Sequence, residues 1–171
     1  EGAVIATSAV RPTKAEVEAT LPRFTGPIAQ VPPAYSALKV DGERAYDLAR
    51  KGEAVELASR NVTIHRLELD TNGGAGVLES ITLLAHVSKG TYIRSLARDI
   101  AQALGTCGTV TMLRRVKAGP FDLSQAISLD KLNEIGKGAP LEQILLPLEA
   151  GLDDIPAIDL DPEQARAVRE G

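Results

Sequence analysis

Residues 62–69 alternate apolar and polar positions, and the alternation changes phase between Ile64 and Leu67. Such a change is typical of a strand with a β-bulge, because one extra residue turns every later side chain to the other face. Residues 77–87 also alternate, and the glycine-rich residues 72–76 separate the two stretches. We therefore predict two strands that form an antiparallel hairpin around a turn.

Apolar residues at a spacing of four predict a helix from Ser95 to Leu104. Leu96, Ile100 and Leu104 fall on one face of this helix. Gly105 follows directly, and glycine is the residue that most often ends a helix. The pattern therefore gives both the buried face and the end of the element.

Capping residues mark two more helices. Thr13 and Asp161 are each followed three residues later by Glu or Gln, which is the spacing of a capping box. We predict helices from Thr13 to before Pro22 and from Asp161 to Gly171, because the residue before a proline disfavours helical backbone. Weaker patterns predict three further helices, at Glu43–Lys51, Leu129–Ile135 and Leu141–Leu146.

Two remaining segments complete the expected fold. Residues 27–40 are rich in turn-forming residues and include Pro32-Pro33, so we interpret them as an ordered loop. Residues 110–116 are interpreted as another strand. Because strands and helices do not alternate regularly, we predict an α+β fold with a largely antiparallel, mixed sheet flanked by helices and loops.

Composition narrows the class of protein. The 171 residues are 44% hydrophobic and 25% charged, which is enough to bury an ordinary core. Cys107 is the only cysteine, which excludes an intrachain disulfide and fits a reducing, cytoplasmic setting. No apolar run approaches the roughly 18 residues that a membrane span needs, so no membrane partner is expected.

Charge is unevenly distributed along the chain. The net charge of −4 argues against a general nucleic-acid binder. Residues 89–120 nevertheless hold six basic residues against Asp99 alone, a net of +5, whereas residues 121–171 hold four basic and eleven acidic residues, a net of −7. A local basic segment is what a phosphate-binding edge requires, and solvated charge on a helix and a strand is the alternative.

Common cofactor and metal motifs are absent from the sequence. His65 and His86 lie far apart in the sequence, and Cys107 has no partner at ligand spacing. Neither a Walker loop nor a dinucleotide-binding glycine fingerprint occurs. We expect no metal and no cofactor.

The segment from Ser88 to Leu96 has the features of a binding site for an anion. A predicted strand ends there and a predicted helix begins, and backbone N–H groups at a helix start favour an anion. Tyr92 offers a flat ring with a polar tip, and Arg94 offers a planar fork for a carboxylate or phosphate. The alternative is structural: Tyr92 in the core and Arg94 as a cap or ion-pair partner.

Several motifs together resemble the TruB family of tRNA pseudouridine synthases. Pro32 to Lys39 matches the family run Pro-x-x-Tyr-Ser-Ala-x-Lys, and Ser88 to Arg94 matches Ser-Lys-Gly-Thr-Tyr-Ile-Arg in full. The remaining matches are Gly42, Tyr46, Ala49, Arg50 and Leu113 to Arg115. Their order and spacing agree from about residue 1 to about residue 150, which makes the set much more specific than any single motif.

The resemblance implies an isomerase that converts uridine 55 of the tRNA T-arm to pseudouridine. The family flips the uridine into a pocket, and an aspartate attacks the nucleoside without a cofactor or metal. Arg94 matches the arginine that orients this aspartate and keeps it ionised. Tyr92 matches the pocket tyrosine beside the flipped base, and Leu113 matches an apolar residue that packs against it.

Further substrate contacts are expected around this pair. Tyr35 and Lys39 lie in the other motif, and we interpret them as residues that support the pocket. Lys89, Arg114 and Arg115 are expected to contact phosphates or the edge of the site, because all three belong to the basic segment. The expected partner is the T-arm stem-loop of tRNA, and the protein is expected to act as a monomer.

One part of the family pattern is missing from the sequence. The aspartate motif, Gly-x-Leu-Asp-Pro-x-Ala-(Thr/Ser)-Gly, precedes all these residues in the family. Asp161 lies before a proline but lacks the glycines, so we interpret it as a helix N-cap.

Residues 1–150 are expected to be the C-terminal part of a catalytic domain, inactive alone. Residues 151–171 are expected to be a linker and the start of an RNA-binding, PUA-like region. A truncated homologue that binds RNA or a partner without catalysis is the alternative.

Overall fold

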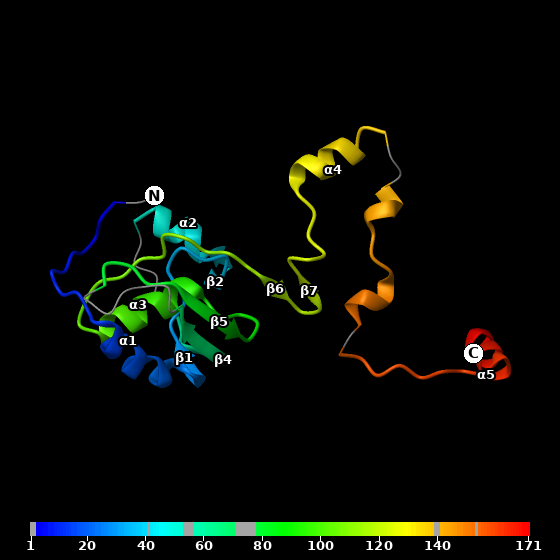
Figure 1. The fold of residues 1–171 in the computed structure, drawn as a ribbon, viewed down its shortest axis with the longest axis horizontal. Helices are drawn as coiled ribbons and strands as arrows, with labels where there is room; N and C mark the ends of the chain where they lie inside the picture. Colours follow the sequence, from blue (N-terminus) through cyan, green and yellow to red (C-terminus); the bar gives the residue numbers. More distant parts are fainter. Residues whose placement is uncertain (1–2, 41, 53–56, 71–77, 139–140, 153) are drawn as a thin grey trace. The chain divides into compact units, whose positions relative to one another are not determined.

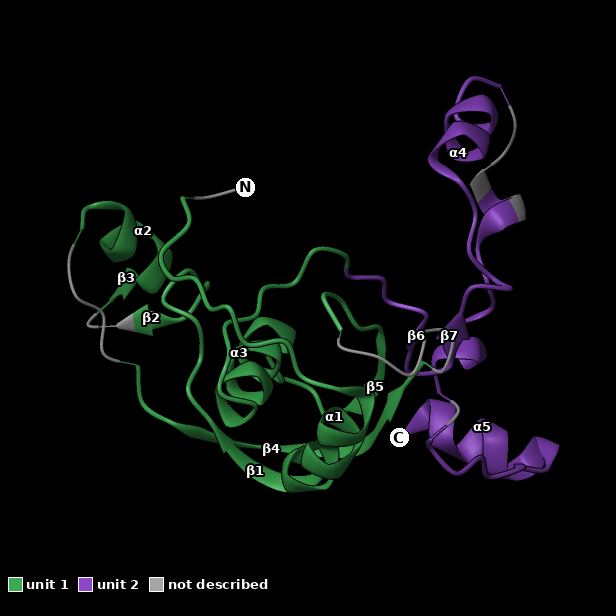
Figure 2. Cartoon of the chain, turned by 60° about the vertical axis from the view of Figure 1, so that its left-hand side comes forward, with its two compact units in different colours: residues 1–112 green, residues 113–171 purple. Residues whose placement is uncertain are grey.

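The computed structural model describes residues 3–40, 42–52, 57–70, 78–138, 141–152 and 154–171. The chain divides into two compact units, residues 1–112 and residues 113–171 (Figure 2). Within the described residues, every helix is too short or too polar to span a lipid bilayer.

The first unit is built on a three-stranded antiparallel sheet in the order β1-β4-β5 (Figure 1). The central strand β4 (Arg60–Leu69) pairs with β1 (Gly26–Gln30) on one side and with β5 (Leu83–Val87) on the other. The hairpin partners β4 and β5 were both predicted, although β5 is shorter than the predicted strand at 77–87. The predicted turn at residues 72–76 lies outside the described residues.

The predicted β-bulge is confirmed in β4. Ile64 pairs with Val87, whereas Arg66 pairs with His86, so the register shifts between them. The shift brings Ile64 and Leu67 to the same face although they are three residues apart, and both are buried. The bulge therefore gives the long strand β4 one continuous apolar face.

Helices α1 and α3 cover this face of the sheet (Figure 2). Helix α1 (Lys14–Thr20) continues into a 3₁₀ turn, η1 (Leu21–Phe24), and α3 (Ile93–Ala103) begins two residues before the predicted helix. The buried cluster between helices and sheet consists of Val17, Leu21, Ile64, Leu67, Leu96 and Ile100. Apolar positions with helical and with strand periodicity thus meet in one core.

Both predicted capping boxes are confirmed. The Oγ1 atom of Thr13 accepts a hydrogen bond from the Glu16 amide at 3.3 Å, and Glu16 Oε2 accepts one from the Thr13 amide at 2.7 Å. Asp161 Oδ1 accepts from the amides of residues 163 and 164 at the start of α5 (Pro162–Glu170). Asp161 is therefore a helix N-cap, as the sequence indicates. Helix α4 spans Leu129–Ile135, as predicted.

The predicted helix at 43–51 is shorter than expected. Strand β3 (Glu43–Arg44) pairs with β2 (Lys39–Val40), and helix α2 (Ala45–Arg50) follows. Pairing with β2 takes the first two residues out of the helix. Ala45, the first helical residue, is fully buried.

The prediction of a loop over residues 27–40 is wrong at both ends, because β1 extends to Gln30 and β2 spans Lys39–Val40. Strand β1 includes Pro27, although proline lacks the N–H that a ladder uses. Within the described sheet β1 is an edge strand that pairs only with β4, and an edge tolerates proline. Residues 31–38 are irregular, as predicted.

The predicted strand at 110–116 is also wrong. These residues pair with no strand in the described part of the chain, and most of them are exposed. Two-residue strands β6 (Lys117–Ala118) and β7 (Phe121–Asp122) form a small hairpin just after them. An apolar run becomes a strand only where a neighbouring backbone is available for pairing.

The second unit holds this hairpin and short helices but no core of its own. The predicted helix at 141–146 is a 3₁₀ turn, η2 (Leu141–Ile144), because Pro147 disfavours helical backbone just before it. Another 3₁₀ turn, η3, spans Leu148–Gly151. None of the described residues from 113 to 171 is buried, and Leu148 is 80% exposed.

Removal of the central apolar side chain should destabilise the first unit strongly. Ile64→Ala is expected to lower the free energy of unfolding by about 2–5 kcal/mol, since it leaves a cavity between β4 and the helices. Leu84→Ala is the matched control, because Leu84 is half-exposed on the next strand. The control should change stability by about 0.5 kcal/mol or less. Urea unfolding measures both, and equal losses would contradict the assigned core.

The capping box at α1 should make stability depend on pH. Hydrogen bonds from the Thr13 backbone and hydroxyl lower the pKa of Glu16 below its ordinary value of 4.5. A carboxylate with a lowered pKa stabilises the fold above pH 4.5, and the contribution disappears as the pH falls through the folded-state pKa. The stability difference between the wild type and Glu16→Ala should therefore shrink between pH 7 and pH 3. An equal difference at both pH values in urea unfolding would contradict this.

Candidate active site

A tight turn connects β5 to α3. The Ser88 amide donates to the Thr63 carbonyl at 2.8 Å, and the Thr63 amide donates to Ser88 Oγ at 2.9 Å. Thr91 Oγ1 donates to the Ser88 carbonyl at 2.9 Å. Gly90 has a φ of 86°, a conformation that other residues adopt at a cost. These contacts fix the direction in which the chain enters α3.

Tyr92 is the N-cap residue of α3, and its backbone is held by Gln30. The Tyr92 amide donates to Gln30 Oε1 at 2.8 Å, and Gln30 Nε2 donates to the Tyr92 carbonyl at 3.2 Å. Gln30 is only 1% exposed, whereas Tyr92 is half-buried. The last residue of β1 thus fixes the backbone of a predicted catalytic residue.

Arg94 reaches the loop that carries the other predicted motif. Its Nη2 donates to the Tyr35 carbonyl at 2.8 Å, and the side chain is exposed. Within the described residues this is its one hydrogen bond, so further N–H donors of the guanidinium point to no protein acceptor. An anchored guanidinium with free donors is suited to a carboxylate.

The same loop is tied to α3 at a second point. Ser95 Oγ donates to the Val31 carbonyl at 2.8 Å, and Arg98 Nη2 donates to it at 3.0 Å. Arg98 also pairs with Asp99 at 2.7 Å, so its charge is partly balanced. Two donors on one carbonyl satisfy both of its lone pairs and hold residues 31–35 against the helix start.

Aromatic rings line the outer side of this loop. The rings of Tyr35 and Tyr46 pack edge to face with centroids 5.7 Å apart, and the Arg50 guanidinium lies 4.7 Å from the Tyr46 ring centroid. Tyr35 is 50% exposed. Tyr35 therefore meets Arg94 through its carbonyl and still presents its ring to solvent.

The structure brings together some of the predicted site residues. Arg94 contacts the Tyr35 carbonyl where the irregular loop meets the start of α3, and Tyr92 is the N-cap residue of the same helix. Lys39 and Lys89 are exposed, and no contact within the described residues joins either to Tyr92 or Arg94. The others, Leu113, Arg114 and Arg115, belong to the second unit and are exposed there.

Gln30, Ser95 and Arg98 were missed in the sequence. Their partners lie 62 to 67 residues away, so no local spacing reveals them. His65 and His86, although far apart in the sequence, lie on adjacent strands with ring centroids 4.9 Å apart. No group of three or more potential metal ligands occurs in the described part of the chain.

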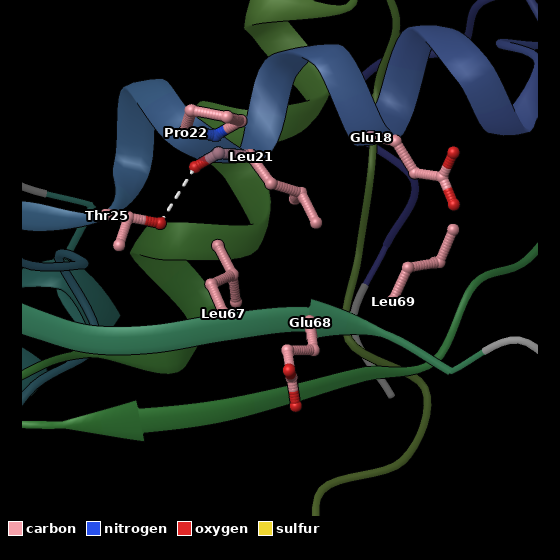
Figure 3. A pocket seen from close by; sticks show the side chains of 7 residues that line it. All are labelled: Glu18, Leu21, Pro22, Thr25, Leu67, Glu68 and Leu69. Atoms are coloured by element: carbon pink, nitrogen blue, oxygen red, sulfur yellow. Dashed lines mark hydrogen bonds between the residues drawn. The ribbon is translucent and has the colours of Figure 1, made fainter.

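An open pocket of about 550 Å³ lies elsewhere, between η1 and β4 (Figure 3). The side chains of Leu21, Leu67 and Leu69 point into it, Glu18 extends toward Leu69, and Glu68 points to the other side of β4. Thr25 Oγ1 donates to the Leu21 carbonyl at the side of the pocket. None of the candidate site residues predicted from the sequence lines this pocket. It is therefore separate from the junction at Tyr92.

A solved structure shares this fold. The chain matches one chain in the crystal structure of a Cbf5-Nop10-Gar1 complex with a TM-score of 0.67, over 97% of this chain and 46% of that one. Sequence identity is 24%, so the likeness concerns the fold alone. It agrees with the predicted class: an α+β pseudouridine synthase catalytic fold.

Family models match almost the whole chain. Residues 1–93 match the TruB family pseudouridylate synthase N-terminal domain, and residues 94–153 match the tRNA pseudouridylate synthase B C-terminal domain. The chain therefore belongs to the TruB family of pseudouridylate synthases, as its motifs indicate.

Two relatives carry the name tRNA pseudouridine synthase B. The protein of Novosphingobium aromaticivorans is 72% identical and that of Zymomonas mobilis is 54% identical, each over the whole of this chain. The chain spans 57% and 55% of these relatives, little more than half their length.

Two buried serines should respond differently to alanine. Ser95 bonds to the Val31 carbonyl, whereas Ser36, 5% exposed, has a hydroxyl without a hydrogen-bond partner in the described part of the chain. Ser95→Ala should cost roughly 0.5–1 kcal/mol of unfolding free energy, after the helix propensity of alanine is included. Ser36→Ala should be neutral or stabilising by up to about 1 kcal/mol, because an unpaired polar group is removed. Urea unfolding in the reverse order would contradict this hydrogen-bond assignment.

Proposed function

We propose that the protein containing this chain is a tRNA pseudouridine synthase that isomerises uridine 55 of the T-arm. The observation that carries this proposal is the arrangement of Tyr92 and Arg94, two residues apart at the start of α3, in a chain of the TruB family. Its substrate would place the protein in the cytoplasm.

Arg94 pairs with the attacking aspartate in this proposal. Its bond to the Tyr35 carbonyl fixes one end of the guanidinium, and the remaining donors form a fork for a carboxylate. A positive charge beside an aspartate favours the ionised form, which is the nucleophilic one. The aspartate comes from polypeptide outside the 171 residues, because no matching motif occurs in them.

Tyr92 lies against the flipped uridine. Its ring supplies an apolar face for the base, and its hydroxyl supplies a polar group at the edge of the pocket. The base leaves the stack, the glycosidic bond breaks after attack by the aspartate, and the uracil reattaches through carbon. Substrate and product have the same atoms, so the reaction needs no oxidant, reductant or added group. We therefore propose that the protein uses no cofactor.

The remaining predicted residues bind the RNA. Leu113 packs against the base, and Tyr35 and Lys39 support the pocket. The exposed side chains of Lys89, Arg114 and Arg115 contact phosphates, whose negative charge they neutralise. We also propose that the predicted boundary near residue 150 separates the catalytic domain from an RNA-binding region.

Loss of Arg94 should impair chemistry more than binding. In the full-length protein, Arg94→Ala is expected to lower the rate of pseudouridine formation in a T-arm stem-loop by at least about 100-fold, since the aspartate loses its orientation. RNA affinity should stay within about threefold, less than 1 kcal/mol, because the arginine faces the protein's own carboxylate.

Arg23→Ala provides the control for this experiment. Arg23 is exposed on η1, and no hydrogen bond or ion pair within the described residues joins it to Tyr92 or Arg94. The control should retain the wild-type rate. Wild-type turnover in Arg94→Ala would refute the role of Arg94, and RNA binding without any product in the wild type would favour the non-catalytic alternative.

A further inference from the structure

Gln30 is the buried side chain that contacts the backbone of Tyr92 on both sides. It ends β1, is 1% exposed, and makes hydrogen bonds of 2.8 and 3.2 Å to the amide and carbonyl of Tyr92. The two residues are 62 positions apart in the sequence. The oxygen and the nitrogen of this buried side-chain amide therefore both bind the backbone of one residue, Tyr92.

The chemistry of the two bonds fixes the orientation of the amide. A backbone N–H can only donate, so it must meet Oε1, and a carbonyl can only accept, so it must meet Nε2. The Gln30 side chain thus pairs with Tyr92 as a neighbouring strand would. Without these bonds, the amide of the half-buried N-cap residue Tyr92 would lose its acceptor at a cost in stability.

Tyr92 has little other restraint on its backbone. It precedes the first helical residue of α3, and no side chain of its own caps the helix. Its carbonyl also accepts the first intrahelical bond, from Leu96 at 3.0 Å. With Gln30 present, both backbone groups of Tyr92 are held, so the direction of its Cα–Cβ bond is fixed relative to β1.

The other ties across the junction act on different atoms. Ser95 and Arg98 bond to the Val31 carbonyl, and Arg94 bonds to the Tyr35 carbonyl. They hold the loop, whereas Gln30 alone among the described residues holds the Tyr92 backbone from outside its own helix. This difference separates a role in positioning Tyr92 from a general role in stability.

We propose that Gln30 is a positioning residue for Tyr92, which it holds in place against the flipped base through the two backbone hydrogen bonds. The proposal rests on the proposed function, because Tyr92 needs an exact position only if it contacts the substrate. A displacement of about 1 Å at a reacting group can lower a rate by about 100-fold. Substrate binding depends on many contacts and is less sensitive to one ring.

The test uses the full-length protein and a T-arm stem-loop. Gln30→Met preserves side-chain length and burial but removes both hydrogen bonds. Its kcat should fall by about 10- to 100-fold, and its KM should change by about threefold or less. Val17→Ala is the control for lost stability, because it removes buried side-chain volume from the core on α1 and leaves both hydrogen bonds to Tyr92 in place. The control should keep kcat within about threefold.

Gln30→Glu adds a pH-dependent test of the same two hydrogen bonds. A neutral carboxyl group donates one hydrogen bond and accepts another, as the amide does, but a carboxylate only accepts. The kcat of this variant relative to the wild type should therefore rise as the pH falls. This ratio also decides the question if Gln30→Met fails to fold, since a flat ratio overturns the proposal.

The outcomes separate this inference from the proposed function. A wild-type protein that forms no pseudouridine refutes the proposed function and the role of Gln30 with it. An active wild type together with an unchanged kcat in Gln30→Met refutes the role of Gln30 alone. Equal losses of kcat in Gln30→Met and Val17→Ala also refute it, because both variants would then report stability. A selective loss in Gln30→Met supports it.

Discussion

Hydrogen bonds between residues 30–35 and the start of α3 hold the candidate site together. Residues 31–35 form no regular secondary structure, so the loop has no ladder to fix it. Instead, Gln30 bonds to Tyr92, while side chains of α3 donate to the carbonyls of Val31 and Tyr35. Each bond pairs a backbone group that would cost free energy if it were buried without a partner. Together the bonds also restrict the motion of the loop. The irregular loop can therefore present the Tyr35 ring at a defined place and anchor the Arg94 guanidinium of α3 through the Tyr35 carbonyl.

The core beneath the junction makes this arrangement possible. The bulge in β4 aligns Ile64 and Leu67 on one face, and α3 packs there through Leu96 and Ile100. Because the helix is anchored along its length, its first residues are fixed without a side-chain cap of their own. The apolar packing supplies most of the stability, whereas the polar ties decide which side chains face the site.

The two units differ in how they are stabilised. Residues 1–112 combine a sheet, helices and a shared buried cluster. In residues 113–171, capped helices such as α4 and α5 occur without any buried side chain among the described residues. Caps define where a helix starts, but packing supplies most helix stability in proteins. The basic residues 114 and 115 thus lie on an exposed part of the chain.

The local sequence by itself determined many of the structural elements of this protein. Capping boxes at Thr13 and Asp161, the phase change in β4 and the motif around Tyr92 each lie within a few residues, so the sequence reveals them. The strand β1, the contact between the rings of His65 and His86, and the hydrogen bonds of Gln30 to Tyr92 depend on partners far along the chain. Only the tertiary structure decided them, because a strand or a buried amide becomes stable when folding brings its hydrogen-bond partner beside it.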